Sequence, residues 1–164
     1  EESIRVPLFI ADLRRPASRQ ARKAGAMALN IDVAPTLLDY AGVTAPGGMQ
    51  GRSLRGWVEK HRMQDWRTEW FYEHHFGPKI IPPSEGVRTE RWKYLRYVNE
   101  SPPTEELFDL KRDPRERRNL AAEPKHAERL AQLRERWQAM SETLRFSWAR
   151  RSPRPWRPSR RTAL

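Results

Sequence analysis

Two adjacent histidines, His74 and His75, are the residues of this sequence best suited to bind a ligand. They end the segment 66–75, WRTEWFYEHH, whose aromatic side chains predict a β-strand. Because neighbouring strand residues face opposite sides, at most one of the two imidazoles can point into a cleft. The other would meet the core or solvent, and a purely structural role remains the alternative for both. No second histidine or carboxylate pair accompanies them at metal-ligand spacing, so we expect no metal site in this chain.

Other residue types that perform catalysis are scarce. The chain of 164 residues contains no cysteine, which excludes a cysteine nucleophile and a thiolate metal site within it. Neither a G-x-S-x-G motif nor a glycine-rich phosphate-binding loop occurs. A Cys or Ser followed by x-Pro-x-Arg is the modification motif of one class of hydrolases, but in 101–105, SPPTE, a glutamate occupies the arginine position. The sequence therefore predicts no catalytic residue.

The histidine-bearing strand is expected to belong to a small antiparallel sheet. The segment 86–98, GVRTERWKYLRYV, predicts a β-hairpin with its turn near Glu90 and Arg91. Large side chains on both sides of this hairpin indicate that both of its faces need cover. A further strand is expected at 105–110, EELFDL, whereas the proline-containing stretch 76–85 is expected to be a loop.

One helix is available to cover this sheet. It begins near Pro124 and carries apolar residues at spacings of three and four: Leu130, Leu133, Trp137, Met140 and Leu144. We expect this stripe to lie against one face of a four-stranded antiparallel sheet.

The N-terminal part predicts different elements. The apolar run 4–11, IRVPLFIA, is typical of a strand buried on both faces in a parallel sheet, and 26–29 is expected to be a short strand. Asn30 or Asp32 would cap a helix that ends at Gly42 and presents an apolar stripe including Ile31 and Leu37. Ser53 would cap a second, short helix. A parallel strand without neighbouring strands indicates a piece of a longer protein.

The net charge of +11 is concentrated in one region. Seven arginines and no acid lie in residues 145–164, an Arg/Pro-rich stretch for which we expect no secondary structure. A basic module that grips nucleic acid or an anionic glycan through this tail is therefore an alternative function.

Several short motifs occur in a fixed order along the chain: RVPL at 5–8, NIDVAPTLLDYAG at 30–42, QGRSL at 50–54, GVRTERWKY at 86–94, and ELFDL at 106–110, followed by DP at 113–114 and NL at 119–120. Together they resemble the C-terminal part of type I sulfatases, in the group that includes N-sulfoglucosamine sulfohydrolase and bacterial mucin- and heparan-desulfating enzymes. The resemblance covers about residues 1–144.

The resemblance implies an α/β fold with three parts. Residues 1–60 would form the last strand and helices of an alkaline-phosphatase-like sulfatase domain. Residues 61–144 would form the C-terminal subdomain, an antiparallel sheet with one helix, and residues 145–164 the tail. In this family a formylglycine attacks the sulfur beside a calcium ion, and both groups belong to the N-terminal domain, which is missing here.

The resemblance also implies a role. This chain would be inactive by itself, with no cofactor of its own, and would shape the pocket for a sulfated saccharide in the complete enzyme. His74 and His75 fall where related enzymes often bring a residue toward the sugar. A periplasmic or secreted location is common in the family, whereas membrane insertion and nucleic-acid binding are not expected.

Overall fold

The structure is a computed structural model that describes residues 1, 4–16, 23–60, 63–75 and 82–151. The chain divides into two compact units, which are Glu1–Trp70, called unit 1, and Phe71–Leu164, called unit 2. The expected boundary lay near residue 60.

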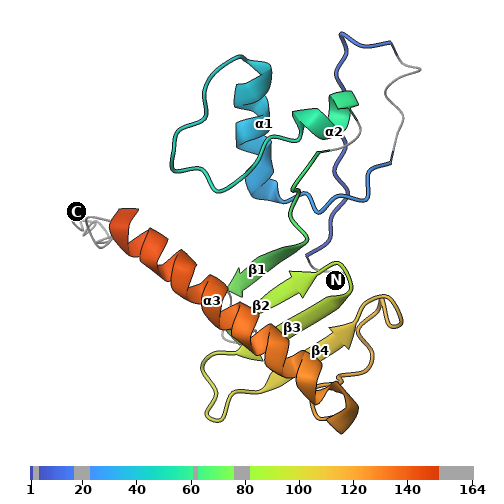
Figure 1. Ribbon diagram of the computed structural model, residues 1–164, viewed down its shortest axis with the longest axis vertical. Helices are drawn as coiled ribbons and strands as arrows, with labels where there is room; N and C mark the ends of the chain where they lie inside the picture. The colour runs from blue at the N-terminus through green and yellow to red at the C-terminus, as the bar shows by residue number, and fades with distance from the viewer. Residues whose placement is uncertain (2–3, 17–22, 61–62, 76–81, 152–164) are drawn as a thin grey trace, which may run out of the picture. The chain divides into compact units, whose positions relative to one another are not determined.

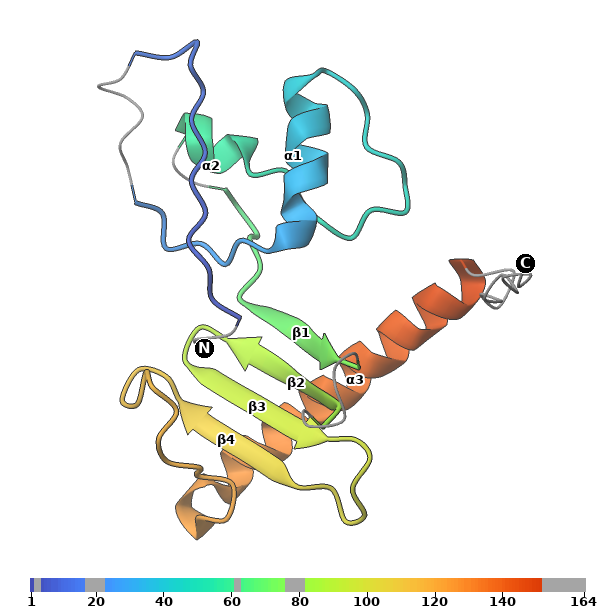
Figure 2. The same cartoon turned by 180° about the vertical axis from the view of Figure 1, so that it is seen from behind.

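Unit 2 is built on a four-stranded sheet of order β1-β2-β3-β4 (Figures 1 and 2). The strands are β1 (Glu69–His74), β2 (Ser84–Thr89), β3 (Trp92–Tyr97) and β4 (Glu105–Asp109). Strand β3 pairs antiparallel with both β2 and β4. The predicted hairpin is confirmed, with its turn at Glu90 and Arg91, where the hydroxyl of Thr89 accepts a hydrogen bond from the Trp92 amide at 2.9 Å. The predicted loop 76–85 is wrong at its end, because Ser84 and Glu85 already pair with β3.

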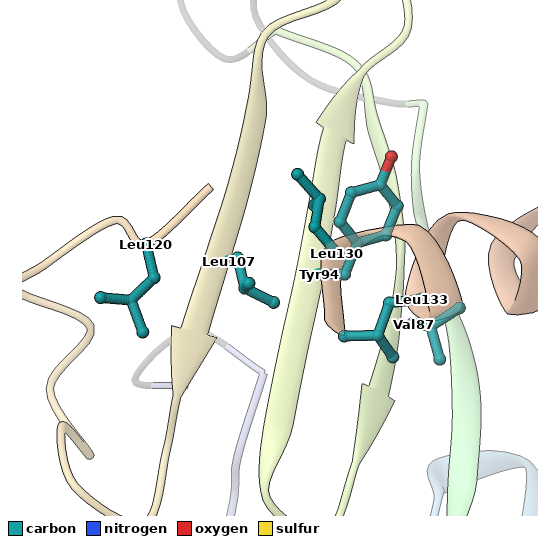
Figure 3. Packing of buried hydrophobic residues seen from close by; sticks show 6 residues of the cluster. All are labelled: Val87, Tyr94, Leu107, Leu120, Leu130 and Leu133. Carbon is teal, nitrogen blue, oxygen red and sulfur yellow. The ribbon is translucent and has the colours of Figure 1, made fainter. Parts of the chain in front are cut away.

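A long helix covers one face of this sheet. A single 3-10 turn, η3 (Pro124–His126), leads into α3 (Ala127–Arg151). Leu130 and Leu133 are buried, and Trp137 and Met140 pack beside them, as the stripe predicted. Figure 3 shows the core between helix and strands, formed by Val87, Tyr94, Leu107, Leu120, Leu130 and Leu133.

The C-terminal tail, residues 145–164, is predicted to have no secondary structure. The absence of secondary structure after residue 144 is wrong up to Arg151, because α3 continues to that residue. The remainder of the Arg/Pro-rich tail, 152–164, lies outside the described residues. Among the described residues, no helix is long and apolar enough to cross a membrane.

Asn119 fastens the chain that leads from β4 to α3. Its side-chain oxygen accepts hydrogen bonds from the amides of Leu107 and Ala121, both at 3.0 Å, and its side-chain nitrogen donates to the Glu105 carbonyl at 2.9 Å. The Leu120 amide also donates to the Leu107 carbonyl at 2.8 Å. The Asn-Leu motif of the sequence therefore extends the sheet beyond β4 and positions the start of α3.

The described residues of unit 1 form three short helices, η2 (Asn30–Asp32), α1 (Val33–Tyr40) and α2 (Arg55–Lys60). The predicted helix ends as expected at Gly42, which adopts φ +70°, a left-handed conformation that glycine adopts without strain. Ser53 caps α2 by accepting a hydrogen bond from the Arg55 amide at 3.2 Å.

Asp32 joins three segments of unit 1. Its carboxylate is completely buried and accepts hydrogen bonds from the amides of Leu29 and Arg52, both at 2.8 Å. The guanidinium of Arg67 forms a two-point ion pair with the same carboxylate, through Nη1 to Oδ2 and through Nη2 to Oδ1 at 2.7 Å. Burial alone would raise the pKa of Asp32, but the bonds from Arg67 and the two amides hold this pKa below its ordinary value.

The QGRSL motif passes η2 at close range and is hydrogen-bonded to α1. A side chain on Gly51 would lie 1.9 Å from the carbonyl oxygen of Ile31, so only glycine fits at this crossing. The amide of Leu54 donates to the Thr36 hydroxyl at 2.9 Å, and the Ser53 hydroxyl donates to Asp39 at 2.5 Å. The motifs at 30–42 and 50–54 therefore pack against each other and are joined by these hydrogen bonds.

Three predictions for unit 1 are wrong. Residues 4–11 form no strand, and Phe9 is 89% exposed; the segment 26–29 also lacks strand structure. A strand needs a partner for its backbone groups, and the described residues before Glu69 supply none. The predicted apolar stripe of α1 does not face a core, since Leu37 is 65% exposed. Instead Pro35 and Thr36 are buried, because α1 docks through hydrogen bonds to residues 51–54.

Leu133 offers a direct test of the core of unit 2. The substitution Leu133→Ala removes a side chain that is 3% exposed between α3 and the sheet. We expect the free energy of unfolding to fall by about 2–5 kcal/mol, measured by denaturant titration. Glu135→Ala, an exposed position on the same helix, is the matched control and should leave the midpoint nearly unchanged. Equal effects of the two substitutions would contradict the docking of α3.

Asp32 should make unit 1 sensitive to acid. A carboxyl group with a lowered pKa in the folded chain stabilises the fold above its unfolded pKa, near 3.8, and loses this contribution as the pH falls through the folded value. The hydrogen-exchange protection factors of the Leu29 and Arg52 amides, corrected for the intrinsic exchange rate at each pH, should therefore fall below about pH 4. Asp32→Asn should remove this pH dependence and destabilise unit 1 by roughly 3 kcal/mol, because Arg67 loses its buried counter-charge. Exposed Asp65, changed to Asn, is the control; loss of the pH dependence in that variant instead would contradict the assignment.

Candidate functional site

His75 is tied to the face of the sheet that α3 covers. It follows β1 directly, and its Nε2 lies 3.1 Å from Oε1 of Glu85 on β2. The Glu85 side chain is only 3% exposed, whereas that of His75 is 40% exposed. The half-exposed imidazole of His75 therefore contacts a carboxylate that is buried beneath it.

His74 has a different environment. It is the last residue of β1, partly buried, and its Nε2 is shielded from solvent without a hydrogen-bond partner among the described residues. Strand alternation places it on the same side as Tyr72, which interacts electrostatically with Tyr97 on β3. Tyr97 lies next to Arg96 and therefore faces away from α3. A shielded, unpaired ring nitrogen is uncommon in folded proteins, and it leaves His74 able to form one further hydrogen bond.

Glu85 also holds α3. Its second oxygen, Oε2, accepts a hydrogen bond from Nε1 of Trp137 at 3.1 Å. The neighbouring residue across the hairpin is Arg96, whose guanidinium carbon lies 4.1 Å from the centre of the Trp137 ring. Trp137 is thus held by a hydrogen bond to Glu85 and by a cation–π contact with Arg96.

The pattern of charges continues onto β4. Arg96 pairs in register with Glu105, which accepts hydrogen bonds from Tyr94 at 2.6 Å and from Nε of Arg134 at 2.8 Å. The bonds from Arg134 hold the pKa of Glu105 below its ordinary value. Burial, together with the bond to Glu105, raises the pKa of Tyr94. We call Glu85, Arg96 and Glu105 the charged row; it lies next to the apolar row Val87, Tyr94 and Leu107.

Several carboxylates of the described chain are engaged by arginine side chains. Among the described residues, no group of three His, Asp or Glu side chains could hold a metal ion. Three carboxylates form ion pairs with arginine: Asp32 with Arg67, Asp109 with Arg91 at 2.6 Å, and Glu105 with Arg134.

Sequence reasoning missed the two residues that organise this site. The sequence predicts a loop at Glu85. In the structure Glu85 lies two residues before Val87 on β2, so both side chains are on the same face of the strand. Trp137 was assigned to the apolar stripe, which is correct for its ring but does not account for its Nε1–H. The periodicity of the sequence identifies a face, but it does not identify the partner of a polar atom.

Comparisons with known proteins agree with this architecture. A family model described as N-sulphoglucosamine sulphohydrolase, C-terminal, matches residues 1–143. The chain is 33% identical over 138 residues to an N-acetylglucosamine-6-O-sulfatase and 35% identical over 141 residues to a Delta 4,5-hexuronate-2-O-sulfatase, both of Bacteroides thetaiotaomicron. These matches cover 81% and 82% of this chain but 24% and 28% of the relatives. The chain thus spans about a quarter of the length of the curated relatives it matches.

Solved structures of other proteins share the fold of this chain. A protein in complex with its substrate D-glucosamine-2-N,6-O-disulfate is 31% identical, with a TM-score of 0.66 over 77% of this chain and 26% of that chain. A phosphonate monoester hydrolase of Agrobacterium radiobacter, 23% identical, shares the fold with a TM-score of 0.63 over 74% of this chain and 26% of that chain. The predicted fold class, part of an alkaline-phosphatase-like α/β enzyme with a four-stranded antiparallel sheet, is confirmed. Because the family model spans residues 1–143 and the fold recurs in these structures, the chain belongs to the sulfatases, in the N-sulphoglucosamine sulphohydrolase C-terminal family.

Proposed function

We propose that this chain is the C-terminal part of a sulfatase that removes sulfate from a saccharide, and that it contributes to the substrate pocket rather than to the attack on sulfur. The relatives named above include sulfatases of a hexosamine and of a hexuronate, and one related structure holds a disulfated glucosamine. This breadth supports a sulfated sugar as the substrate class without selecting one sugar.

The distribution of charged groups supports a role without chemistry at sulfur. Sulfatases use a formylglycine and a calcium ion to attack the ester. In this chain there is no cysteine, and the carboxylates of Asp32, Asp109 and Glu105 are each paired with an arginine. We propose that the reacting groups come from residues outside this chain.

His74 is the residue we propose to contact the sugar. The observation that carries this assignment is its shielded Nε2, which lacks a hydrogen-bond partner among the described residues. A sugar hydroxyl or a sulfate oxygen would satisfy this nitrogen, because a neutral imidazole nitrogen can either donate or accept one hydrogen bond. His75 is already engaged with Glu85, so we assign it the supporting role of the pair.

The first functional test concerns the chain alone. Purified residues 1–164 should show no turnover of an aryl sulfate or a sulfated sugar, with or without added calcium, because we propose that the nucleophile and the calcium ligands lie outside this chain. The measurement is sulfate release at high protein concentration. Turnover above that of a heat-denatured sample would contradict the proposed division of labour.

The second test separates the two histidines in a complete sulfatase that contains this segment. His74→Ala should lower kcat/KM for the sulfated saccharide by roughly 10- to 100-fold, the cost of losing a hydrogen bond to a charged or well-placed group. Turnover of a small aryl sulfate should stay within about twofold, because binding energy from the sugar serves only the sugar substrate.

His75→Ala is the matched control, since it removes the same side chain one residue further along. It should lower thermal stability and reduce saccharide turnover less than His74→Ala does. Equal losses on both substrates for both variants would show that the histidines are structural. Unchanged saccharide turnover in His74→Ala would remove this residue from the pocket.

A further inference from the structure

We infer that Glu85 is a positioning residue for the pocket, because it holds the end of β1, and hence His74, against β2 and α3. This inference rests on the proposed sugar contact of His74. Glu85 receives two bonds from two other elements, one from His75 at the end of β1 and one from Trp137 on α3, both at 3.1 Å. It therefore connects three elements at the point where β1 ends.

The position of β1 in the sheet explains why such a connection is needed. In the order β1-β2-β3-β4, β1 is an edge strand, with a neighbouring strand on one side only among the described residues. The end of an edge strand is held by few bonds, so the direction of its last side chain is poorly constrained unless something else fixes it. The bond from His75 to Glu85 fixes the residue directly after His74, and strand alternation then directs His74 to the opposite face.

Burial of the carboxylate makes this connection rigid. Glu85 is 3% exposed, and a buried carboxylate is retained only where hydrogen bonds and opposite charges compensate it. Arg96 pairs with Glu85 in register across the hairpin and stacks on the Trp137 ring, so the strand pairing and the helix packing meet at the same point. Moving His75 away would leave an oxygen of Glu85 without that bond inside the protein, so the end of β1 has one favoured position.

Glu105 provides a matched comparison. It lies in the same charged row, on the same face, and is also a hydrogen-bonded carboxylate, but its partners are Tyr94 and Arg134. Neither Tyr94 nor Arg134 is close to the end of β1 in the sequence, and the hydrogen bonds described for them do not involve β1. Replacing Glu105 should therefore cost stability without changing the environment of the histidines.

A spectroscopic test uses Glu85→Gln in the full chain. The carboxylate offers two acceptor oxygens to two N–H donors, whereas the amide offers one oxygen and one NH₂ group. Either His75 must change from the Nε2–H to the Nδ1–H tautomer, or the Trp137 indole N–H must lose its acceptor. Ring ¹⁵N shifts of His75 and the indole ¹H shift of Trp137, assigned with Trp137→Phe, report both events.

We expect at least one of these two signals to change in Glu85→Gln and neither to change in Glu105→Gln. Unchanged signals in a folded Glu85→Gln chain overturn the inference. If Glu85→Gln does not fold, Trp137→Phe replaces it in the kinetic measurement below, since it removes one donor to Glu85 and keeps an aromatic ring over Arg96.

The kinetic measurement uses a complete sulfatase that contains this segment. Glu85→Gln should lower kcat/KM for the sulfated saccharide about tenfold, as expected for a small displacement of a contacting group, with aryl sulfate turnover unchanged. Glu105→Gln should leave the ratio of kcat/KM for the saccharide to kcat/KM for the aryl sulfate as it is in the parent enzyme. If His74→Ala lowers this ratio and Glu85→Gln does not, the positioning role is overturned. If His74→Ala itself has no effect, the sugar contact fails, and the spectroscopic result alone decides whether Glu85 holds the end of β1.

Discussion

The packing of α3 on β2, β3 and β4 is the interaction on which unit 2 depends, and it combines two adjacent rows of different chemistry. The apolar row of Val87, Tyr94 and Leu107 meets Leu130 and Leu133 and supplies most of the hydrophobic stabilisation. The charged row adds little net free energy, because desolvation offsets its ion pairs and hydrogen bonds. Its contribution is geometric: Trp137 must lie over Arg96 with its N–H toward Glu85, so the helix has one angle and one register on the sheet.

Unit 1 is held together in a different way. Its completely buried group is a carboxylate, Asp32, and the segments around it meet through Arg67, backbone amides and the close crossing at Gly51. Apolar side chains such as Phe9 and Leu37 are exposed instead of forming a core. Polar bonds define which segments meet, while apolar burial supplies the larger free energy in most domains. The acid sensitivity predicted for unit 1 thus originates in the carboxylate that this unit buries.

In the candidate site, strand alternation places two neighbouring histidines in different environments. His75 turns toward the covered face and meets a buried carboxylate, and His74 turns the other way with a ring nitrogen that has no partner among the described residues. The sequence analysis predicted that only one of the pair would reach a cleft, and this remains a prediction. Which of them has hydrogen-bonding capacity to spare depended on Glu85, a residue ten positions away on another strand.

The sequence by itself determined the local elements and the family. The hairpin at 86–98, the helix after Pro124 and the Gly42 terminus follow from periodicity and from the restricted conformations of glycine and proline, which act between near neighbours. The order of the motifs was enough to assign the chain to the sulfatases. Only the tertiary structure decided that 4–11 is not a strand, that α1 buries Thr36 in place of Leu37, and that Glu85 joins His75 to Trp137. The reason is physical: strand pairing, burial and the satisfaction of polar atoms depend on partners far away in the chain, and no local pattern specifies those partners.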